Sequence, residues 1–300
     1  RLGLRVPDDV SVIGFDDLPL AAMVQPTAML FTIIGHAHLE FLRDRRGVLQ
    51  EKTSVLDTMP DDAIAFCNGD DDLLRAMTCR QRKVTFGLSA GCDVRAVDVR
   101  DLGDEGSTCT IVAGTRHIPV RISAYGQHMV YAALEGAAVG IEYGLTDAEI
   151  IRGIAAYQPV GSRARVVRTA RYTVIDDCYN ANPDSTAAAL RSMATLPAGR
   201  RVAILGNMGE LGANADALHR ETGVCAAKAG VSLVITCGEL AKNIAVGAAA
   251  ADSAVAVASF DTLDALLPAL PQLLQTGDCV LVKASHSMQF ERVVQALTQA

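Results

Sequence analysis

Two side chains fourteen residues apart, His38 and Lys52, have the chemistry to share a metal ion. His38 lies in the run GHAHLEF at residues 35–41, and Lys52 lies within the apolar stripe of a predicted helix over residues 46–58. Burial lowers the pKa of an ammonium, and the neutral amine can react with carbon dioxide to form a carbamate, whose oxygens bind metal. Spacing alone favours a simpler alternative, in which Lys52 extends its ammonium into solvent and His38 is an ordinary loop histidine.

A second polar group follows a short predicted strand at residues 63–67. The run NGDD at residues 68–71 begins with Asn68, which could contact a nucleotide or form an Asx turn. The residue types favour neither alternative over the other.

The run IDDCYNANPDS at residues 175–185 joins a predicted strand to a predicted helix. Asn182 is suited to cap this helix, because Pro183 follows it at the first helical position. Capping does not account for Asp177 or Tyr179, which precede the cap. These two residues therefore become candidates for ligand binding.

Two more polar runs, GNMGELG at residues 206–212 and KASHSM at residues 283–288, each follow a predicted strand. Ligands of parallel α/β sheets gather at the carboxyl ends of the strands. For the lysine of the second run, a simple surface charge is the alternative, but its place at a strand end favours a substrate-side role. The candidate substrate-binding residues of the two runs are Gly209, Glu210, Leu211, Lys283 and Ser285.

The elements that must position these residues fall into two parts, separated by turn residues near 159–162. The first part contains a predicted strand at 83–86 and helices at 127–140 and 147–155, the second helix capped by Thr146. The second part alternates strands with helices, which predicts a Rossmann-like domain with a mostly parallel sheet. Its predicted strands are 172–176, 201–205, 232–236 and 279–283.

Together these motifs resemble the Mur ligase family over residues 31–300. The resemblance lies in the HLEF run with its lysine, the 175–185 run and the 206–212 run. It implies an α/β protein with a truncated central, ATP-binding domain at 29–160 and a C-terminal domain at 161–300. The 175–185 run is most similar to the branch of the family that adds D-alanyl-D-alanine to UDP-N-acetylmuramoyl-tripeptide.

The resemblance also implies roles for individual residues. His38 and a carbamylated Lys52 would be the catalytic pair that holds Mg²⁺ beside the γ-phosphate of ATP, and Tyr179 would lie on the substrate side. The tripeptide carboxylate would be activated as an acyl phosphate, which the amine of D-alanyl-D-alanine attacks. The residues expected to contact ATP are Asn68, Arg163, Asp177 and Asn182.

Some features depart from the family pattern. Ile33, Asn207 and Ala284 stand where relatives usually carry Asn, Asp and Gly. The sequence contains no Gly-Lys dipeptide and hence no Walker-type phosphate loop, so we expect an inactive fragment of the enzyme. Residues 1–28 instead resemble part of the sugar-binding domain of LacI-family repressors, which predicts a foreign leader.

Composition narrows the classes of function. The 300 residues carry a net charge of −7, which favours small-molecule partners over nucleic acid. No stretch is apolar enough to span a membrane, and eight cysteines without a Cys-x-x-Cys pair suggest reduced, mostly buried thiols. We therefore expect a cytoplasmic monomer. The alternatives are another Mur-type ligase, either tripeptide-forming or polyglutamate-adding, and a fragment of a LacI-type sugar-sensing regulator.

Overall fold

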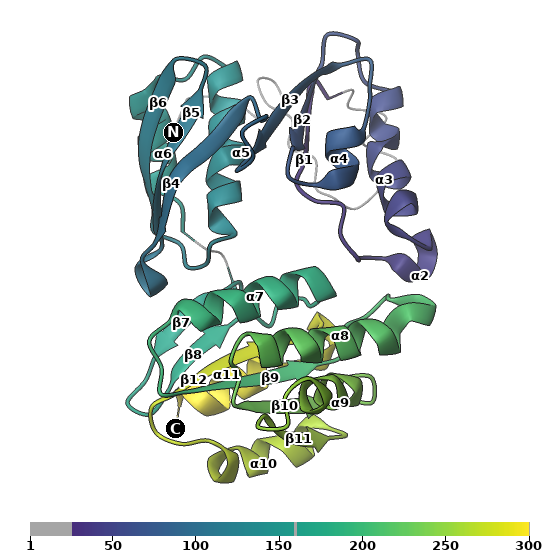
Figure 1. Cartoon of the computed structure of the whole chain (residues 1–300), viewed down its shortest axis with the longest axis vertical. Coiled ribbons are helices and arrows are strands. Elements are labelled where there is room, and N and C mark those ends of the chain that lie inside the picture. Colours follow the sequence, from purple (N-terminus) through teal and green to yellow (C-terminus); the bar gives the residue numbers. More distant parts are fainter. Residues whose placement is uncertain (1–25, 159–160, 300) are drawn as a thin grey trace.

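The computed structural model describes residues 26–158 and 161–299, which form two α/β domains, each built on a six-stranded sheet (Figure 1). The predicted leader at 1–28 falls almost wholly outside the described residues, as does the predicted boundary at 160. The α/β fold class is confirmed.

The sheet of the first domain has the order β1-β2-β3-β4-β5-β6. Strands β1 to β4 run parallel, whereas β4, β5 and β6 form an antiparallel meander that the sequence analysis did not predict. The strands are β1 (Ala28–Phe31), β2 (Ile64–Asn68), β3 (Arg82–Gly87), β4 (Val94–Asp101), β5 (Ser107–Ala113) and β6 (Arg116–Ile122).

Helices cover both faces of this sheet, because side chains along a strand alternate between faces. Phe66 of β2 faces the cluster that includes Leu134, whereas Ala65 and Cys67 face the cluster that includes Val48. Helices α5 (Met129–Glu142) and α6 (Asp147–Ala155) cover the first face, and α3 (Arg45–Thr53) and α4 (Asp72–Ala76) cover the second. A short helix, α2 (Leu39–Leu42), precedes α3.

Of the helices predicted for this domain, the one over 46–58 differs in detail from the structure, whereas the one over 147–155 is confirmed. The predicted helix over 46–58 ends at Thr53 and continues as a 3-10 turn over Ser54–Asp57. The predicted cap of α6 is confirmed: the Thr146 hydroxyl accepts a hydrogen bond from the Glu149 N–H, and the Glu149 carboxylate accepts one from the Thr146 N–H.

The sheet of the second domain has the order β11-β10-β9-β12-β8-β7 and is parallel except for β7. All four strands predicted for this domain are present, and edge strands β7 and β11 are additional. The strands are β7 (Arg165–Arg168), β8 (Thr173–Asp176), β9 (Arg200–Gly206), β10 (Leu233–Cys237), β11 (Ala256–Phe260) and β12 (Asp278–Lys283).

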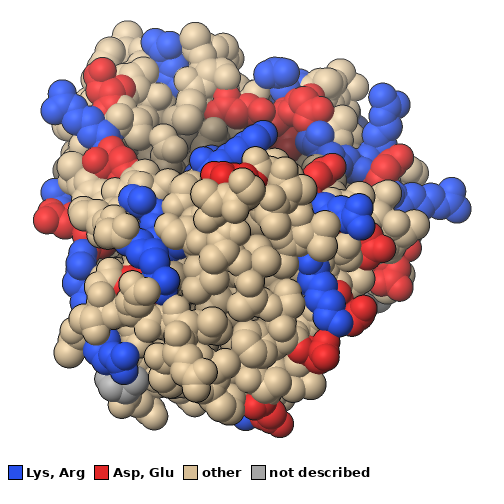
Figure 2. Space-filling model, turned by 60° about the horizontal axis from the view of Figure 1, so that its bottom comes forward, with Lys and Arg blue, Asp and Glu red and all other residues tan. Residues whose placement is uncertain are grey.

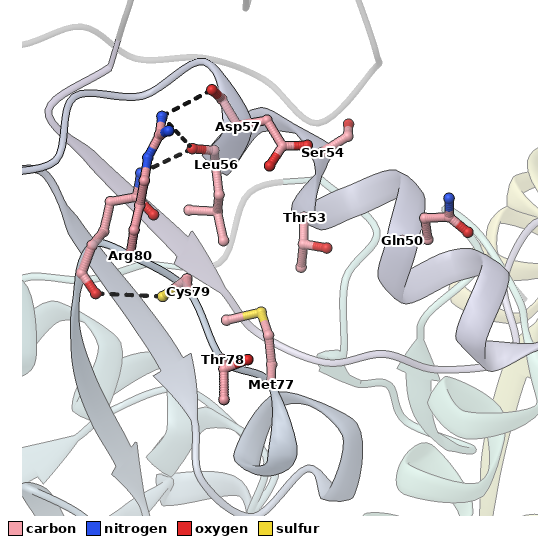
Figure 3. Close-up of a pocket in the computed structure, with 10 residues that line it drawn as sticks. Gln50, Thr53, Ser54, Leu56, Asp57, Met77, Thr78, Cys79 and Arg80 are labelled. Carbon is pink, nitrogen blue, oxygen red and sulfur yellow. Dashed lines mark hydrogen bonds between the residues drawn. The ribbon is translucent and has the colours of Figure 1, made fainter.

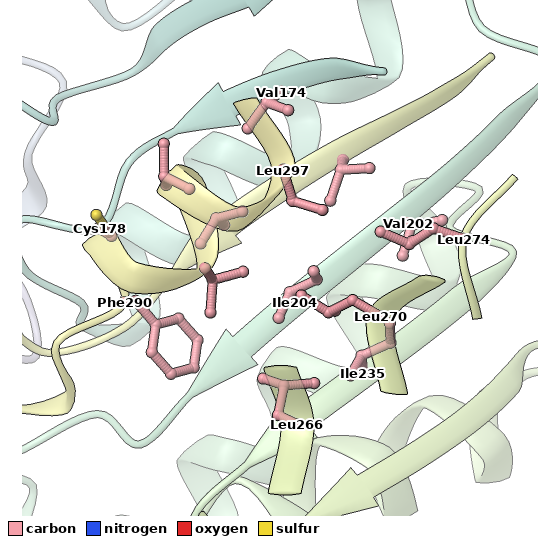
Figure 4. Packing of buried hydrophobic residues seen from close by; sticks show 14 of the residues in the cluster. Val174, Cys178, Val202, Ile204, Ile235, Leu266, Leu270, Leu274, Phe290 and Leu297 are labelled. Atoms are coloured by element: carbon pink, nitrogen blue, oxygen red, sulfur yellow. The ribbon is translucent and has the colours of Figure 1, made fainter. Parts of the chain in front are cut away.

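The helices of the second domain also form two layers, with the sheet between them (Figure 1). One face packs against α10 (Leu263–Leu273) and α11 (Glu291–Thr298), where Leu266, Leu270 and Leu297 meet Ile204 of the central strand (Figure 4). The other face packs against α7 (Pro183–Thr195), α8 (Ala215–Lys228) and α9 (Lys242–Ala251). This doubly wound arrangement leaves the carboxyl ends of the strands free for loops.

The two domains contact each other at several points. Tyr125, at 5% exposure, packs into the second domain's cluster with Leu190 and Met193, and Arg168 forms an ion pair with Asp104 at 2.6 Å.

The face of the molecule on the side of α10 and β11 has a broad area without Lys, Arg, Asp or Glu side chains (Figure 2). Acidic and basic side chains lie around this area. Within the described residues, no helix has the length and apolar character that a bilayer span requires.

All eight cysteines are free, and five of them are buried, as predicted for most of these side chains. Burial raises the pKa of the Cys67 thiol to about 12 and that of Cys109 to about 11. Both therefore remain protonated at neutral pH and act as small apolar side chains.

Glu135 on α5 makes the stability of the protein depend on pH, because burial raises the pKa of its carboxyl group to about 7 from an ordinary 4.5. Between these two values the unfolded chain loses the proton and the folded chain keeps it, so stability falls as pH rises. We expect Glu135→Gln to match the parent near pH 4.5 and to be more stable by about 2–3 kcal/mol at pH 8.

Urea unfolding at both pH values measures this difference. The exposed Glu105 provides the control, since Glu105→Gln should change stability by less than about 1 kcal/mol at either pH. An equal effect of Glu135→Gln at the two pH values would contradict the assignment.

Candidate functional site

Three loops meet at the carboxyl ends of β8, β9 and β12 in the second domain, and they carry most of the predicted site residues. The structure places Asp177, Tyr179 and Asn182 on the loop between β8 and α7, as predicted. The runs 206–212 and 283–288 form the two neighbouring loops, because β12 pairs with both β8 and β9.

Lys283 fixes the first of these loops. Its side chain is 3% exposed, and its ammonium donates to the Asp177 carboxylate at 2.6 Å and to the carbonyl of Asn180 at 2.9 Å. The other carboxylate oxygen of Asp177 accepts a hydrogen bond from the N–H of Ala164. The surface-charge alternative for Lys283 is therefore wrong, because the ammonium is buried and joins two strand ends.

Asn182 caps α7 as its position suggested. Its side-chain oxygen accepts a hydrogen bond from the Ser185 N–H at 2.8 Å, and the Ser185 hydroxyl accepts one from the Asn182 N–H at 3.2 Å. This reciprocal pair satisfies two backbone donors at the helix end. Contact of Asn182 with ATP stays a prediction.

Tyr179 lies at the centre of an exposed group of planar side chains. The Arg163 guanidinium lies 4.1 Å from the centroid of the Tyr179 ring, and the His286 ring lies 5.7 Å from it. The Tyr179 ring is 49% exposed, so it offers a flat surface with a cation beside it, which suits a planar or anionic ligand. His286 was missed from the sequence, although it lies within the KASHSM run.

The loop after β9 is held to the loop after β12. The Gly209 N–H donates to the Ser285 hydroxyl at 2.9 Å, and the Ser285 N–H donates to the carbonyl of Asn207 at 3.1 Å. Leu211 is buried with Met208. The structure thus brings Gly209 and Ser285 together, whereas Leu211 packs with Met208.

Two of the departures from the family pattern fit the fold without strain. The Asn207 side chain accepts a hydrogen bond from the Ala241 N–H at 2.9 Å. Ala284 has no positive φ, so its methyl group does not force an unfavourable backbone conformation. Ile33 is exposed.

His219 lies on α8, after this loop. It is buried and has a structural role. Its Nε2 accepts a hydrogen bond from the Met208 N–H at 3.0 Å, so its Nδ1 donates to the carbonyl of Ala215 at 2.7 Å. Burial lowers its pKa, which favours this neutral tautomer. His219 therefore fixes the start of the 206–212 loop.

In the first domain, the polar side chains of residues 68–71 form hydrogen bonds within the protein. Asn68 donates to the carbonyl of Thr32 and accepts from the Asp70 N–H, both at 2.9 Å, which is the Asx turn considered from the sequence. Asp71 caps α4 and accepts a hydrogen bond from the Ile34 N–H at 2.9 Å. These contacts fix the shape of the loop between β1 and α2.

The two predicted metal ligands lie on different elements of the first domain. His38, with a φ of 58°, contacts the Glu210 carboxylate of the second domain through its Nδ1. Lys52 lies in the last turn of α3, and partial burial lowers the pKa of its ammonium. Among the described residues, no group of three or more His, Cys, Asp or Glu side chains is arranged to hold a metal ion.

A pocket of about 260 Å³ lies elsewhere on the first domain (Figure 3). It lies between the end of α3 and the segment 77–81, where Arg80 donates hydrogen bonds to the carbonyls of Asp57 and Met59. None of the predicted site residues lines it. Most of the predicted site residues lie instead on the loops of the second domain, which His38 of the first domain contacts through Glu210.

Comparison with known proteins gives a consistent result. The family model "Mur ligase, glutamate ligase domain" matches residues 162–286, and "Mur ligase middle domain" matches residues 10–140. The second match begins within residues 1–28, the segment predicted to be a foreign leader, whose first 25 residues lie outside the described structure.

Comparisons with individual proteins extend this result. A UDP-N-acetylmuramoyl-tripeptide--D-alanyl-D-alanine ligase of Bacillus subtilis is 29% identical over 97% of this chain and 63% of its own length. The crystal structure of MurF from Acinetobacter baumannii has a TM-score of 0.85 at 24% identity, covering 93% of this chain and 61% of that one. MurF ligase from Thermotoga maritima, in complex with ADP, has a TM-score of 0.78 at 22% identity, covering 93% and 63%. The chain thus spans less than two thirds of these relatives.

Proposed function

This chain belongs to the Mur ligase family, and we propose that it forms part of the ATP-dependent ligase that adds D-alanyl-D-alanine to UDP-N-acetylmuramoyl-tripeptide. The observation that carries the proposal is the match to such a ligase over 97% of the chain. The meeting of its matching motifs at one domain edge supports it. The product would be a precursor of peptidoglycan, and we propose that the chain acts in cell-wall synthesis in the cytoplasm.

In the proposed reaction, the terminal carboxylate of the tripeptide attacks the γ-phosphorus of ATP and ADP leaves. The amine of D-alanyl-D-alanine then attacks the acyl carbon, loses a proton, and displaces inorganic phosphate. The exposed surface of Tyr179, Arg163 and His286 suits the binding of a planar or anionic group. We assign ATP contacts to Asn68, Arg163, Asp177 and Asn182, and substrate contacts to Tyr179, Gly209, Glu210, Leu211, Lys283 and Ser285.

We propose that magnesium binds at this site as a partly hydrated ion. Mg²⁺ is usually held by one or two protein ligands together with phosphate oxygens and water, so a full protein cage is not required. His38 and a carbamate on Lys52 would be its protein ligands, and partial burial of Lys52 favours the neutral amine that carbamate formation needs. When bound, the ion would neutralise charge on the transferring phosphoryl group.

A chimeric ligase tests the proposal. In this chimera, residues 26–300 replace the matching part of the Bacillus subtilis relative. We expect phosphate release from ATP that requires both UDP-N-acetylmuramoyl-tripeptide and D-alanyl-D-alanine. The 300-residue chain alone should release none, because it lacks a Gly-Lys phosphate loop.

The acceptor substrate on which phosphate release depends distinguishes the proposed function from the alternative functions. Phosphate release that depends on a single amino acid, such as glutamate, instead of the dipeptide would favour another Mur-type ligase. Sugar binding by the 300-residue chain, which keeps residues 1–28, together with no phosphate release from the chimera with any acceptor, would favour the regulator fragment.

A further inference from the structure

The loop between β1 and α2 contacts α7 of the other domain through a single carboxylate. Asp184 Oδ2 accepts a hydrogen bond from the His36 N–H at 2.7 Å, and the same oxygen lies 3.1 Å from His36 Nδ1. These residues are 148 positions apart in the sequence. The contact therefore joins the two domains directly.

Gly35 is fitted to this contact. A Cβ at Gly35 would lie 2.5 Å from Asp184 Oδ2, which is closer than such atoms approach in proteins, and 3.3 Å from Asp184 Cγ, which is a tight contact. The φ of Gly35 does not lie in the left-handed region. Glycine is thus needed here for the close approach of the carboxylate rather than for its backbone freedom.

The position of Asp184 on its own helix does not explain this arrangement. An acidic residue in the first turn interacts favourably with the helix dipole, but Asn182 already satisfies the backbone donor of Ser185. The Asp184 carboxylate is bonded instead to the backbone and ring of His36.

A second contact holds the far end of the same loop. The Glu40 N–H donates to the carbonyl of Glu210 at 3.0 Å, and a Cβ at Gly212 would lie 3.0 Å from the Cα of Glu40. His38 lies between the two contacts and has a positive φ. The loop is thus held against the second domain on both sides of His38.

We propose that Asp184 is a positioning residue, which clasps the Gly35-His36 segment to α7 and thereby orients His38 against the second domain. The role in orienting a metal ligand rests on the proposed function, whereas the clasp itself does not. Asp184 is not expected to touch the reacting atoms. It acts through the backbone of the loop.

Amide hydrogen exchange of the 300-residue chain tests the clasp without any ligand. We expect Asp184→Ala to accelerate exchange at both His36 and Glu40 by about three- to tenfold. Glu40 is the informative position, because its N–H bonds to Glu210 and not to Asp184. Asp184→Asn, which keeps an oxygen acceptor, should restore most of the protection at Glu40.

Gly35→Ala supplies the second arm of the test. Alone, it should accelerate exchange at Glu40 as Asp184→Ala does, since its methyl group displaces the carboxylate. Combined with Asp184→Ala, it should add nothing further, because the atoms that it would strike are gone.

Two controls match these changes. Gly199→Ala adds a methyl group with nothing within 4 Å, and Asp264→Ala removes a first-turn acid from α10. Neither should alter exchange at Glu40. The clasp is refuted if Asp184→Ala leaves Glu40 unchanged, or if the two substitutions act additively.

Activity gives a separate readout. In the chimeric ligase, Asp184→Ala should lower kcat with little change in KM for D-alanyl-D-alanine, and Asp184→Asn should recover part of the loss. An inactive chimera with the expected exchange pattern would reject the proposed function and keep the clasp. A normal kcat with that same pattern would reject the positioning role.

Discussion

Alanine in place of Lys52 should lower the turnover of the chimeric ligase by about a hundredfold or more, the scale expected when one electrostatic contribution to a transition state is removed. The physical basis is the position of Lys52 in the last turn of α3, where partial burial lowers the pKa of its ammonium. A larger fraction of neutral amine is then available to form the carbamate that would bind Mg²⁺. Steady-state phosphate release measures the effect.

The chemistry of the side chain provides the sharper comparison. Small carboxylates such as acetate should partly rescue Lys52→Ala, because they supply the missing oxygens. Lys52→Arg should remain inactive, since a guanidinium stays charged and cannot form the carbamate. Lys228, an exposed lysine in the last turn of α8, is the control, and Lys228→Ala should retain full turnover. Undiminished turnover of Lys52→Ala would leave this residue with a packing role only.

Much of the second domain could be predicted from the sequence, because buried parallel strands are short apolar runs between helical segments. Strands β8, β9, β10 and β12 were found in this way. Edge strand β11, with the sequence AVASF, is largely exposed and lacks such a signal. Strand β6 does alternate between exposed and buried residues, but Pro119 within it weakened the pattern.

The candidate site also combines local features that the sequence predicts with long-range contacts that it does not. Local features such as the cap by Asn182 and the Asx turn of Asn68 follow from residue types at neighbouring positions. The contacts of His36 with Asp184 and of His38 with Glu210 join residues 148 and 172 positions apart. No local pattern encodes such pairs, since they depend on how two separately folded domains approach each other. The burial of Lys283 was missed because its partner Asp177, although in the same domain, lies 106 positions away in the sequence.

Lys283→Met should reduce the stability of the second domain by about 3 kcal/mol, because it leaves a partner of a buried ion pair without its counter-charge. Methionine preserves most of the volume of the side chain, so a cavity contributes little to the loss. The Asp177 carboxylate and the Asn180 carbonyl would each lose the ammonium that they now contact at 2.6 and 2.9 Å. Urea unfolding, followed through amide exchange in β8 and β12, reports on this domain specifically.

A double-mutant cycle separates the ion pair from other effects of the substitution. Asp177→Asn combined with Lys283→Met removes the uncompensated charge, so the combined loss should be smaller than the sum of the two single losses by about 1–3 kcal/mol. Lys242, which pairs with Glu239 and Asp261 at the surface, is the matched control, and Lys242→Met should destabilise the domain far less than Lys283→Met. A loss for Lys283→Met as small as this control would show that its ammonium is not held by the loop. In that case Lys283 could turn to a substrate without first breaking the bonds that hold Asp177.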